Sequence, residues 1–242
     1  MSDGNFKQLK DHIIICGLGG TAMHIIEQLE STPEKSDYHD HENLVIDSSE
    51  EAITKVKAKW PNTNCLVGNA ADDDVLEQAN VEDAYGIFPV LSSEKDNLYI
   101  TMAARQLNPQ IRIVSRTADM HNIGNKLFKG GANSVISPNL MGGLRLVSEI
   151  VRPNATDFLD ELLHQADPWL QIEEMTVSGD SPISGLSLKE IGLPKRSGLN
   201  IIALKKRDHL SYTYNPSATE LIEDGDIVVV LGYREQIDMV KN

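Results

Sequence analysis

The chain has 242 residues, enough for one large domain or two modest ones with a sizeable core. With 22 basic and 36 acidic side chains, its net charge is −14, which argues against nucleic acid as the principal partner because like charges repel. The longest apolar runs, 13–16 and 227–231, are far shorter than the roughly 18 residues of a membrane-spanning helix. The N-terminus also lacks the apolar stretch of a secretory signal, so a soluble cytoplasmic protein is expected.

Strand-like and helix-like segments alternate from residue 12 to about residue 136. Six apolar runs are predicted as strands: 12–16, 44–46, 65–67, 85–90, 111–114 and 134–136. Helices are predicted after residues 17–20, from near Ser49, and over 75–79, 97–107 and 121–129. Apolar strands separated by helices are typical of a parallel sheet covered on both faces, so residues 1–138 are predicted to form a doubly wound, Rossmann-like α/β domain.

Two amphipathic helices are predicted within 139–167, separated where Pro153 disfavours a helical Arg152. The apolar side chains of each helix share one face: Leu140, Leu144, Val147 and Val151 in the first, and Phe158, Leu159, Leu162 and Leu163 in the second. The sequence leaves open whether this hairpin packs on its own domain or on a partner. From residue 168 the pattern is strand-rich, with runs at 174–177, 200–204 and 227–231 and a short helix to Ile191, which predicts a small α+β domain over 168–242.

The cysteines and histidines predict neither a disulfide nor a metal site. Cys16 and Cys65 are too few for a disulfide framework or a four-cysteine zinc site, and both are expected to be inert thiols at buried strands. In the common doubly wound order their strands lie ~9–10 Å apart, whereas a disulfide needs Cα atoms within ~7 Å. His39 and His41, flanked by carboxylates in the segment 36–43, could bind a metal, but an exposed polar insertion is the favoured interpretation and no metal site is predicted.

Residues 17–22, Gly-Leu-Gly-Gly-Thr-Ala, fit the pattern G-x-G-x-x-(G/A) between a strand and a helix. Gly17 would allow the tight turn, and Gly19 would allow the backbone to approach a pyrophosphate closely. Ala22 would let the helix pack closely on the strand, and the helix N-terminus offers N–H groups to phosphate. Asp47, at the end of the second strand, is the expected acceptor for ribose hydroxyls. The alternative is a Rossmann scaffold that binds no nucleotide. Two further loops, 68–72 and 91–97, follow strands at the edge where such sheets bind ligands.

With these residues in place, the chain resembles the regulator of K⁺ conductance (RCK) family, which includes Trk/Ktr subunits and the gating rings of prokaryotic potassium channels. The resemblance covers nearly the whole chain. It rests on the entry into the first strand at 9–17, the loop Gly68-Asn69-Ala70, the fourth helix at 97–109, the stretch 130–138, and the segments 185–188 and 225–232.

The resemblance implies a cytoplasmic regulator, not an enzyme, that binds a nucleotide or other small ligand and gates a potassium channel or transporter at the membrane. It implies that the chain assembles through the Rossmann face and the crossover helices into a homo-oligomer, as a dimer and an octameric ring. It also implies that residues 168–242 form a ligand-sensing domain. Together with the loop positions, it assigns nucleotide contacts to Gly17, Leu18, Gly19, Gly20, Thr21, Ala22, Asp47, Ser48, Asn69, Ala70, Leu91 and Arg116.

Departures from the family pattern refine the ligand. Gly20 stands where ATP-responsive members carry an arginine, which favours NAD(H) or another adenine nucleotide smaller than ATP. Val90, Arg116 and Ala118 stand where calcium-gated members have carboxylates, so that calcium site is expected to be absent. Asn69 replaces an acidic residue, and Arg116 could face a phosphate or form an ordinary surface ion pair.

Two other functions stay open at this stage. A small NAD-dependent oxidoreductase would need an acid or base beside the nicotinamide, and only His164 and His209 follow the Rossmann segment, neither with a convincing partner. A regulator of a non-potassium transporter, such as a proton antiporter, would share all of these sequence features.

Overall fold

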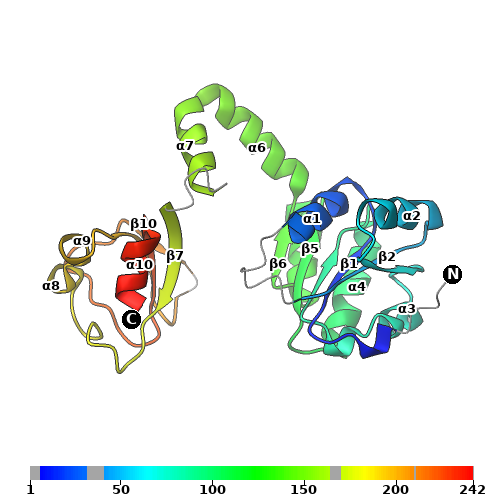
Figure 1. Cartoon of the computed structure of the whole chain (residues 1–242), viewed down its shortest axis with the longest axis horizontal. Coiled ribbons are helices and arrows are strands. Elements are labelled where there is room, and N and C mark those ends of the chain that lie inside the picture. Colours follow the sequence, from blue (N-terminus) through cyan, green and yellow to red (C-terminus); the bar gives the residue numbers. More distant parts are fainter. Residues whose placement is uncertain (1–5, 32–40, 164–169, 210, 242) are drawn as a thin grey trace. The chain divides into compact units, whose positions relative to one another are not determined.

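The computed structural model describes residues 6–31, 41–163, 170–209 and 211–241, and the chain divides into two compact units, 1–146 and 147–242 (Figure 1). The first unit contains a six-stranded parallel sheet in the order β3-β2-β1-β4-β5-β6. Its strands are β1 (Ile13–Cys16), β2 (Asn43–Asp47), β3 (Asn64–Val67), β4 (Gly86–Pro89), β5 (Arg112–Arg116) and β6 (Ser134–Ile136). Its helices are α1 (Gly20–Ser31), α2 (Glu50–Lys59), α3 (Asp73–Gln78), α4 (Glu94–Leu107) and α5 (Asn125–Lys129). The predicted doubly wound, Rossmann-like sheet is confirmed.

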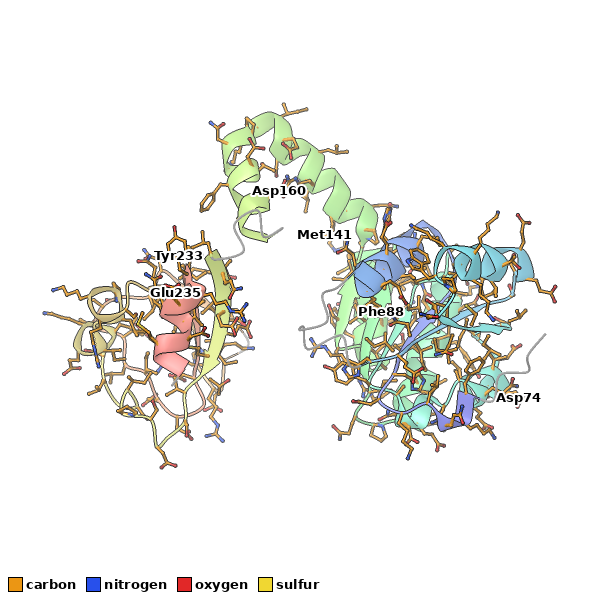
Figure 2. The ribbon with its side chains drawn as sticks, viewed as in Figure 1. Asp74, Phe88, Met141, Asp160, Tyr233 and Glu235 are labelled. Carbon is orange, nitrogen blue, oxygen red and sulfur yellow. The ribbon has the colours of Figure 1, made fainter. Side chains whose placement is uncertain are left out.

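Helices cover both faces of this sheet, which is why its central strands are apolar at successive positions. α1 and α2 pack on one face, in a buried cluster that includes Ile15, Ile26 and Val56. Phe88 of β4, labelled in Figure 2, packs against the same cluster. α3, α4 and α5 pack on the other face, in a cluster that includes Ile14, Ile100 and Leu127.

Three predicted helices differ from the structure. The helix predicted over 75–79 is α3, which begins two residues earlier and ends one residue earlier. α4 begins at Glu94, three residues before the predicted start, because the Ser93 side chain caps it by accepting the N–H of Asp96. The single helix predicted over 121–129 is instead a π-helical turn, Met120–Gly124, followed by α5. Asp119 starts that turn by accepting the N–H groups of two residues, His121 and Asn122. Hydrophobic spacing cannot distinguish these local variations in helix type.

The crossover helices are α6 (Pro138–Val151) and α7 (Pro153–Leu163), and the break between them falls at Arg152, as the proline predicted. α6 has no buried residue. The side chain of Met141, labelled in Figure 2, is 60% exposed. Among the described residues, no helix is long and apolar enough to cross a membrane.

The second unit contains a four-stranded antiparallel sheet in the order β7-β10-β8-β9. Its elements after α7 are β7 (Leu170–Thr176), α8 (Leu188–Ile191), α9 (Leu193–Arg196), β8 (Asn200–Lys205), β9 (Thr213–Tyr214), β10 (Ile227–Tyr233) and α10 (Arg234–Lys241). The expected small α+β fold is confirmed, although α9 and α10 were not predicted. Side chains from these two helices, Leu193 and Ile237, are buried in the core of this unit.

A buried carboxylate holds the turn before β10. Asp226 is 1% exposed and accepts hydrogen bonds from Lys206 Nζ at 2.8 Å and from the N–H groups of Arg207 at 3.1 Å and Glu223 at 2.9 Å. Burial alone would raise the pKa of Asp226, but Lys206 and the two N–H groups outweigh it, and the pKa lies below its ordinary value.

This lowered pKa makes the second unit sensitive to acid. The contribution of Asp226 to stability is present at neutral pH and is lost as the pH falls below about 4, through the folded-state pKa. We expect Asp226→Asn to destabilise the second unit by about 3 kcal/mol at pH 7, because Lys206 loses its buried partner, and by much less at pH 3. Hydrogen exchange of the β10 amides in the full chain measures both values, and equal protection of the two proteins at pH 7 would contradict the expectation.

The two cysteines occupy strands that β2 separates, as predicted. Cys16 pairs with Ile46 and Ile46 pairs with Leu66, so Cys65 is one residue out of register with Cys16. Successive side chains of a strand alternate between faces, so the two thiols point to opposite faces of the sheet. Burial raises the pKa of both thiols, which keeps them protonated at neutral pH.

We therefore expect Cys16 and Cys65 to remain reduced in the purified protein. Its mass should equal that of the dithiol form, and alkylation at neutral pH should leave Cys16 unmodified until the chain is denatured. A mass lower by the two hydrogens of a disulfide, together with one cross-linked peptide, would contradict this prediction.

Candidate nucleotide site

The glycine loop joins β1 to α1 at the carboxyl end of the sheet. Gly17 has a φ of +96°, where an L side chain is strained, and a Cβ there would lie 3.3 Å from the Cα and 3.1 Å from the Cγ of Leu91. A Cβ at Gly19 or Gly20 would meet nothing within 4 Å. Gly17 is therefore required for the turn, whereas Gly19 and Gly20 leave the space above the loop open.

The loop leads directly into α1, whose first N–H groups lack acceptors within the helix and can bind an anion. Thr21 and Ala22 lie in this first turn. Ala22 is fully buried in the cluster between α1 and the sheet, so its side chain serves close packing and only its backbone faces the loop.

Asp47 ends β2 beside the glycine loop. Its Oδ2 accepts the N–H of Leu18 at 2.6 Å, and its Oδ1 accepts the N–H of Ser49 at 2.8 Å, while Ser48 between them is exposed. Each carboxylate oxygen has a second lone pair that can accept a ribose hydroxyl. The two bonds thus orient a ready acceptor next to the loop that would hold phosphate.

The loop after β3 begins next to Asp47, because the N–H of Gly68 donates to the Asp47 carbonyl at 3.0 Å. The Asn69 side chain is engaged locally: its Oδ1 accepts the N–H of Ala71 at 3.1 Å and its Nδ2 donates to Asp72 at 2.9 Å. Ala70 is 2% exposed and packs in the core. Only backbone groups of Ala70 can therefore reach a ligand.

Asn97 organises the opposite side of the site; the sequence placed it at the end of the loop 91–97 but assigned its side chain no role. It is fully buried; its Oδ1 accepts the N–H of Leu91 at 2.9 Å, and its Nδ2 donates to the carbonyls of Leu91 at 3.0 Å and Arg116 at 3.1 Å. Asn97 thus ties the loop after β4 to the end of β5. Its spacing from Ile100 and Ala104 places it on a buried helical face, where a polar residue needs partners, and this signal could have identified it.

Arg116, at the end of β5, also contacts Leu91. Its Nη1 donates to the Leu91 carbonyl at 2.9 Å, whereas its Nε is buried and has no hydrogen-bond partner. Within the described part of the chain, no carboxylate forms an ion pair with Arg116. The structure therefore brings together the glycine loop, Asp47, Leu91 and Arg116 along one edge of the sheet.

The histidines do not join this edge. The His41 side chain is only 9% exposed, stacks on Tyr85 with ring centroids 4.2 Å apart, and bonds through Nδ1 to the Asp11 carbonyl. The expectation that His41 is exposed is therefore wrong, because the Tyr85 ring covers it. His209 is exposed in a turn, and His39 and His164 lie outside the described residues. The described residues contain no group of three or more histidine, cysteine or acidic side chains placed to hold a metal ion.

Known proteins are similar to this chain in sequence and in fold. The TrkA-N domain model matches residues 13–138, more than half of the chain, and the TrkA-C domain model matches residues 172–242. Potassium channel protein 1 of Methanocaldococcus jannaschii is 31% identical over 235 residues, which cover 97% of this chain and 67% of that protein. A Trk system potassium uptake protein TrkA homolog of Pyrococcus abyssi is 25% identical over 224 residues, 90% of this chain and 87% of that protein.

The fold recurs in the human SLO3 gating ring, which matches 95% of this chain with a TM-score of 0.71 and 16% identity, over 45% of its own length. The two domain models match the chain one after the other, and the similarity to the M. jannaschii protein extends over both matched segments. The chain therefore belongs to the regulator of K⁺ conductance family, with a TrkA-N domain followed by a TrkA-C domain.

Proposed function

We propose that this protein is a regulator that binds an adenine nucleotide in its TrkA-N domain and thereby controls potassium flux through a membrane channel or transporter. The observation that carries the proposal is the Asp47 carboxylate, bonded to Leu18 of an open glycine loop at the end of a parallel sheet. Open α/β sheets bind their ligands at this edge. The names of the relatives, a potassium channel protein and a potassium uptake protein, supply the process that is regulated.

The favoured ligand is NAD(H). Strand order reverses between β1 and β4, so a dinucleotide can lie across this switch point, with its adenosine toward Asp47 and its other half toward Leu91. At Gly20 a ligand would meet backbone N–H groups but no positively charged side chain. This suits a pyrophosphate better than ATP, whose third phosphate adds further negative charge. The remaining proposed contacts come from Thr21, Ser48, Asn69, Ala70 and Arg116.

The proposed partners are further copies of this chain and a membrane pore, which would place the protein in the cytoplasm at the membrane surface. Apolar side chains on α6 and α7 are largely exposed in the single chain, and we propose that they form a subunit interface in a dimer and an octameric ring. The ligand must bind two states of that assembly with different affinity, because otherwise it shifts no equilibrium. The boundaries 1–138, 139–167 and 168–242 are proposed for the nucleotide domain, the crossover pair and a second ligand-sensing domain.

Catalysis finds no support at this edge. An oxidoreductase needs a positioned acid or base near the nicotinamide. Two carboxylates at this edge, Asp47 and Glu94, each accept backbone N–H groups, and the arginine Arg116 donates to the Leu91 carbonyl. Regulation of a non-potassium transporter is the remaining alternative, and the names of the relatives favour potassium.

Calorimetry with NADH, NAD⁺, ADP and ATP tests the proposed binding. We expect Asp47→Asn to weaken binding about 10- to 100-fold, because the variant loses charge-assisted hydrogen bonds to the ribose. Glu51→Gln is the matched control, since it removes one exposed carboxylate from the neighbouring helix α2. Failure of all four nucleotides to bind at millimolar concentration would contradict the proposal.

A further inference from the structure

The strand β7 lies at one edge of the sheet in the second unit, where it pairs with β10 on one side only (Figure 1). Just beyond β7, the N–H of Val177 donates to the carbonyl of Asp226 at 2.8 Å. The backbone groups of an antiparallel strand face a given neighbour at every second residue, so Ile172, Glu174 and Thr176 direct their N–H and C=O groups away from β10. Within the described part of the chain, nothing bonds to these backbone groups. β7 therefore presents an open hydrogen-bonding edge.

The length and regularity of β7 suit it to pairing with a further strand. It has seven residues, contains neither proline nor glycine, and pairs with β10 without a bulge. Edge strands of natural proteins are commonly short, bulged or interrupted by proline, which prevents such pairing. The strand at the opposite edge of the same sheet, β9, has only two residues. Of these two edges, β7 is the one to which a strand can add.

A hollow of about 350 Å³ opens beside this edge. Its lining is mostly apolar and includes Met175 of β7, Ile183, Leu193 of α9 and Val240 of α10. Leu193 is buried in the core of the second unit, and the other three side chains are partly buried against that core. Residues opposite one another on neighbouring strands point to the same face of a sheet, so a residue opposite Met175 would also point to the core face. An aliphatic side chain at that position of an added strand would enter the hollow.

The other face of the β7 edge carries negative charge. Glu174 is exposed, and it points to the face opposite to that of its neighbour Met175. Its Oε1 accepts the Tyr212 hydroxyl at 3.3 Å, and no cation among the described residues forms an ion pair with it. Opposite charges on neighbouring strands attract and like charges repel. Pairing with β7 of a second copy would bring Glu173 and Glu174 of both chains to one seam, whereas lysine or arginine opposite Glu174 would be favourable.

We propose that β7 binds an extended segment of another protein by strand addition, with an aliphatic side chain in the hollow beside Met175 and a lysine or arginine opposite Glu174. Hydrogen bonds to the open backbone groups would supply affinity, while the hollow and the carboxylate select the segment. Successive residues of a strand point to opposite faces, so the basic and the aliphatic residue are neighbours in the sequence of the partner. This inference concerns the second unit alone and goes beyond nucleotide binding.

A synthetic peptide, acetyl-Thr-Lys-Leu-Lys-Thr-amide, tests the proposal on the full chain. We expect fluorescence anisotropy of the labelled peptide to show binding at submillimolar concentration. Hydrogen exchange resolved by NMR should show slower exchange of the N–H groups of Ile172, Glu174 and Thr176, because each would gain an acceptor. The same peptide with aspartate in place of leucine should bind about tenfold more weakly or worse, because a carboxylate is costly to place in an apolar hollow.

Charge reversal on β7 tests the preference for a basic segment. Glu174→Lys should weaken binding of the leucine peptide about fivefold or more, since an attraction across the strands becomes a repulsion. Asp208→Lys is the matched control, because it makes the same change of charge at an exposed position in the turn between β8 and β9, away from β7. This control should bind the peptide as the unmodified protein does.

Three results would overturn the proposal. The first is no binding of the leucine peptide by the unmodified chain at millimolar concentration, and the second is binding that leaves exchange of the Ile172, Glu174 and Thr176 N–H groups unchanged. The third is slow exchange of these N–H groups in the chain alone, which would show that a second copy occupies the edge. Calorimetry measures nucleotide binding to the first unit separately, so failure of either proposal leaves the other standing.

Discussion

Replacing Ile150 and Phe158 by aspartate is expected to leave the protein as a 26.7 kDa monomer with an intact TrkA-N domain. The crossover helices carry more apolar surface than a stable monomer leaves in water. Ile150 is 86% exposed, Val147 60% and Phe158 54%, and α6 has no buried residue. These side chains need a partner surface, and two aspartates would each place a charge in it.

The free energy of association through α6 and α7 can be gauged from the apolar area that the interface would bury. At ~25 cal/mol per Å² of apolar surface, covering the two helices of a pair of subunits contributes several kcal/mol, enough to exceed the cost of association. An uncompensated carboxylate in the interface removes that gain and adds the cost of desolvating a charge. Because the substituted residues lie outside the β1–β6 sheet, its fold should be unaffected.

Sedimentation at micromolar concentration measures the change, and hydrogen exchange of the β1 amides monitors the fold. The matched control is Asn139→Asp with Asn154→Asp, which adds the same two charges to the same two helices at exposed polar positions. This control should remain oligomeric. Sedimentation of the unmodified protein as a monomer would contradict the proposed interface and remove the mechanical basis for acting on a pore.

Alanine substitutions at Gly17 and Gly19 should separate folding from ligand binding. Gly17→Ala is expected to destabilise the first unit by about 2–4 kcal/mol, because it combines a positive φ with a contact of 3.3 Å to the Leu91 backbone. Gly19→Ala meets no neighbour within 4 Å, so its free energy of unfolding should change by less than about 1 kcal/mol. The added methyl group would instead occupy the space through which pyrophosphate approaches, and NADH affinity should fall about tenfold or more.

Urea unfolding followed by hydrogen exchange of the β1 amides measures the first effect, and calorimetry with NADH measures the second. Each variant is the control for the other, since both exchange one glycine of the same loop for alanine. Equal stability of the two variants would contradict the role of Gly17 in the turn. Unchanged NADH binding by Gly19→Ala would contradict the proposed position of the pyrophosphate.

Features that depend on neighbouring residues could be predicted from the sequence. The unbroken apolar run 13–16 indicated a strand buried on both faces, the pattern 17–22 indicated a tight strand-to-helix turn, and Pro153 located the break between α6 and α7. Such signals predict an element because backbone conformation and burial are decided within a few residues. They also predicted that Asp47 ends β2, but not what its carboxylate contacts.

Contacts between distant residues were decided only by the tertiary structure. The Asp47 bond to Leu18 spans 29 residues, and the Asn97 amide joins Leu91 to Arg116 across two strands. Stacking of His41 on Tyr85 likewise joins the starts of two strands. The physical reason is register: hydrophobic spacing specifies which face of an element is buried, but not which residue of the next strand lies opposite.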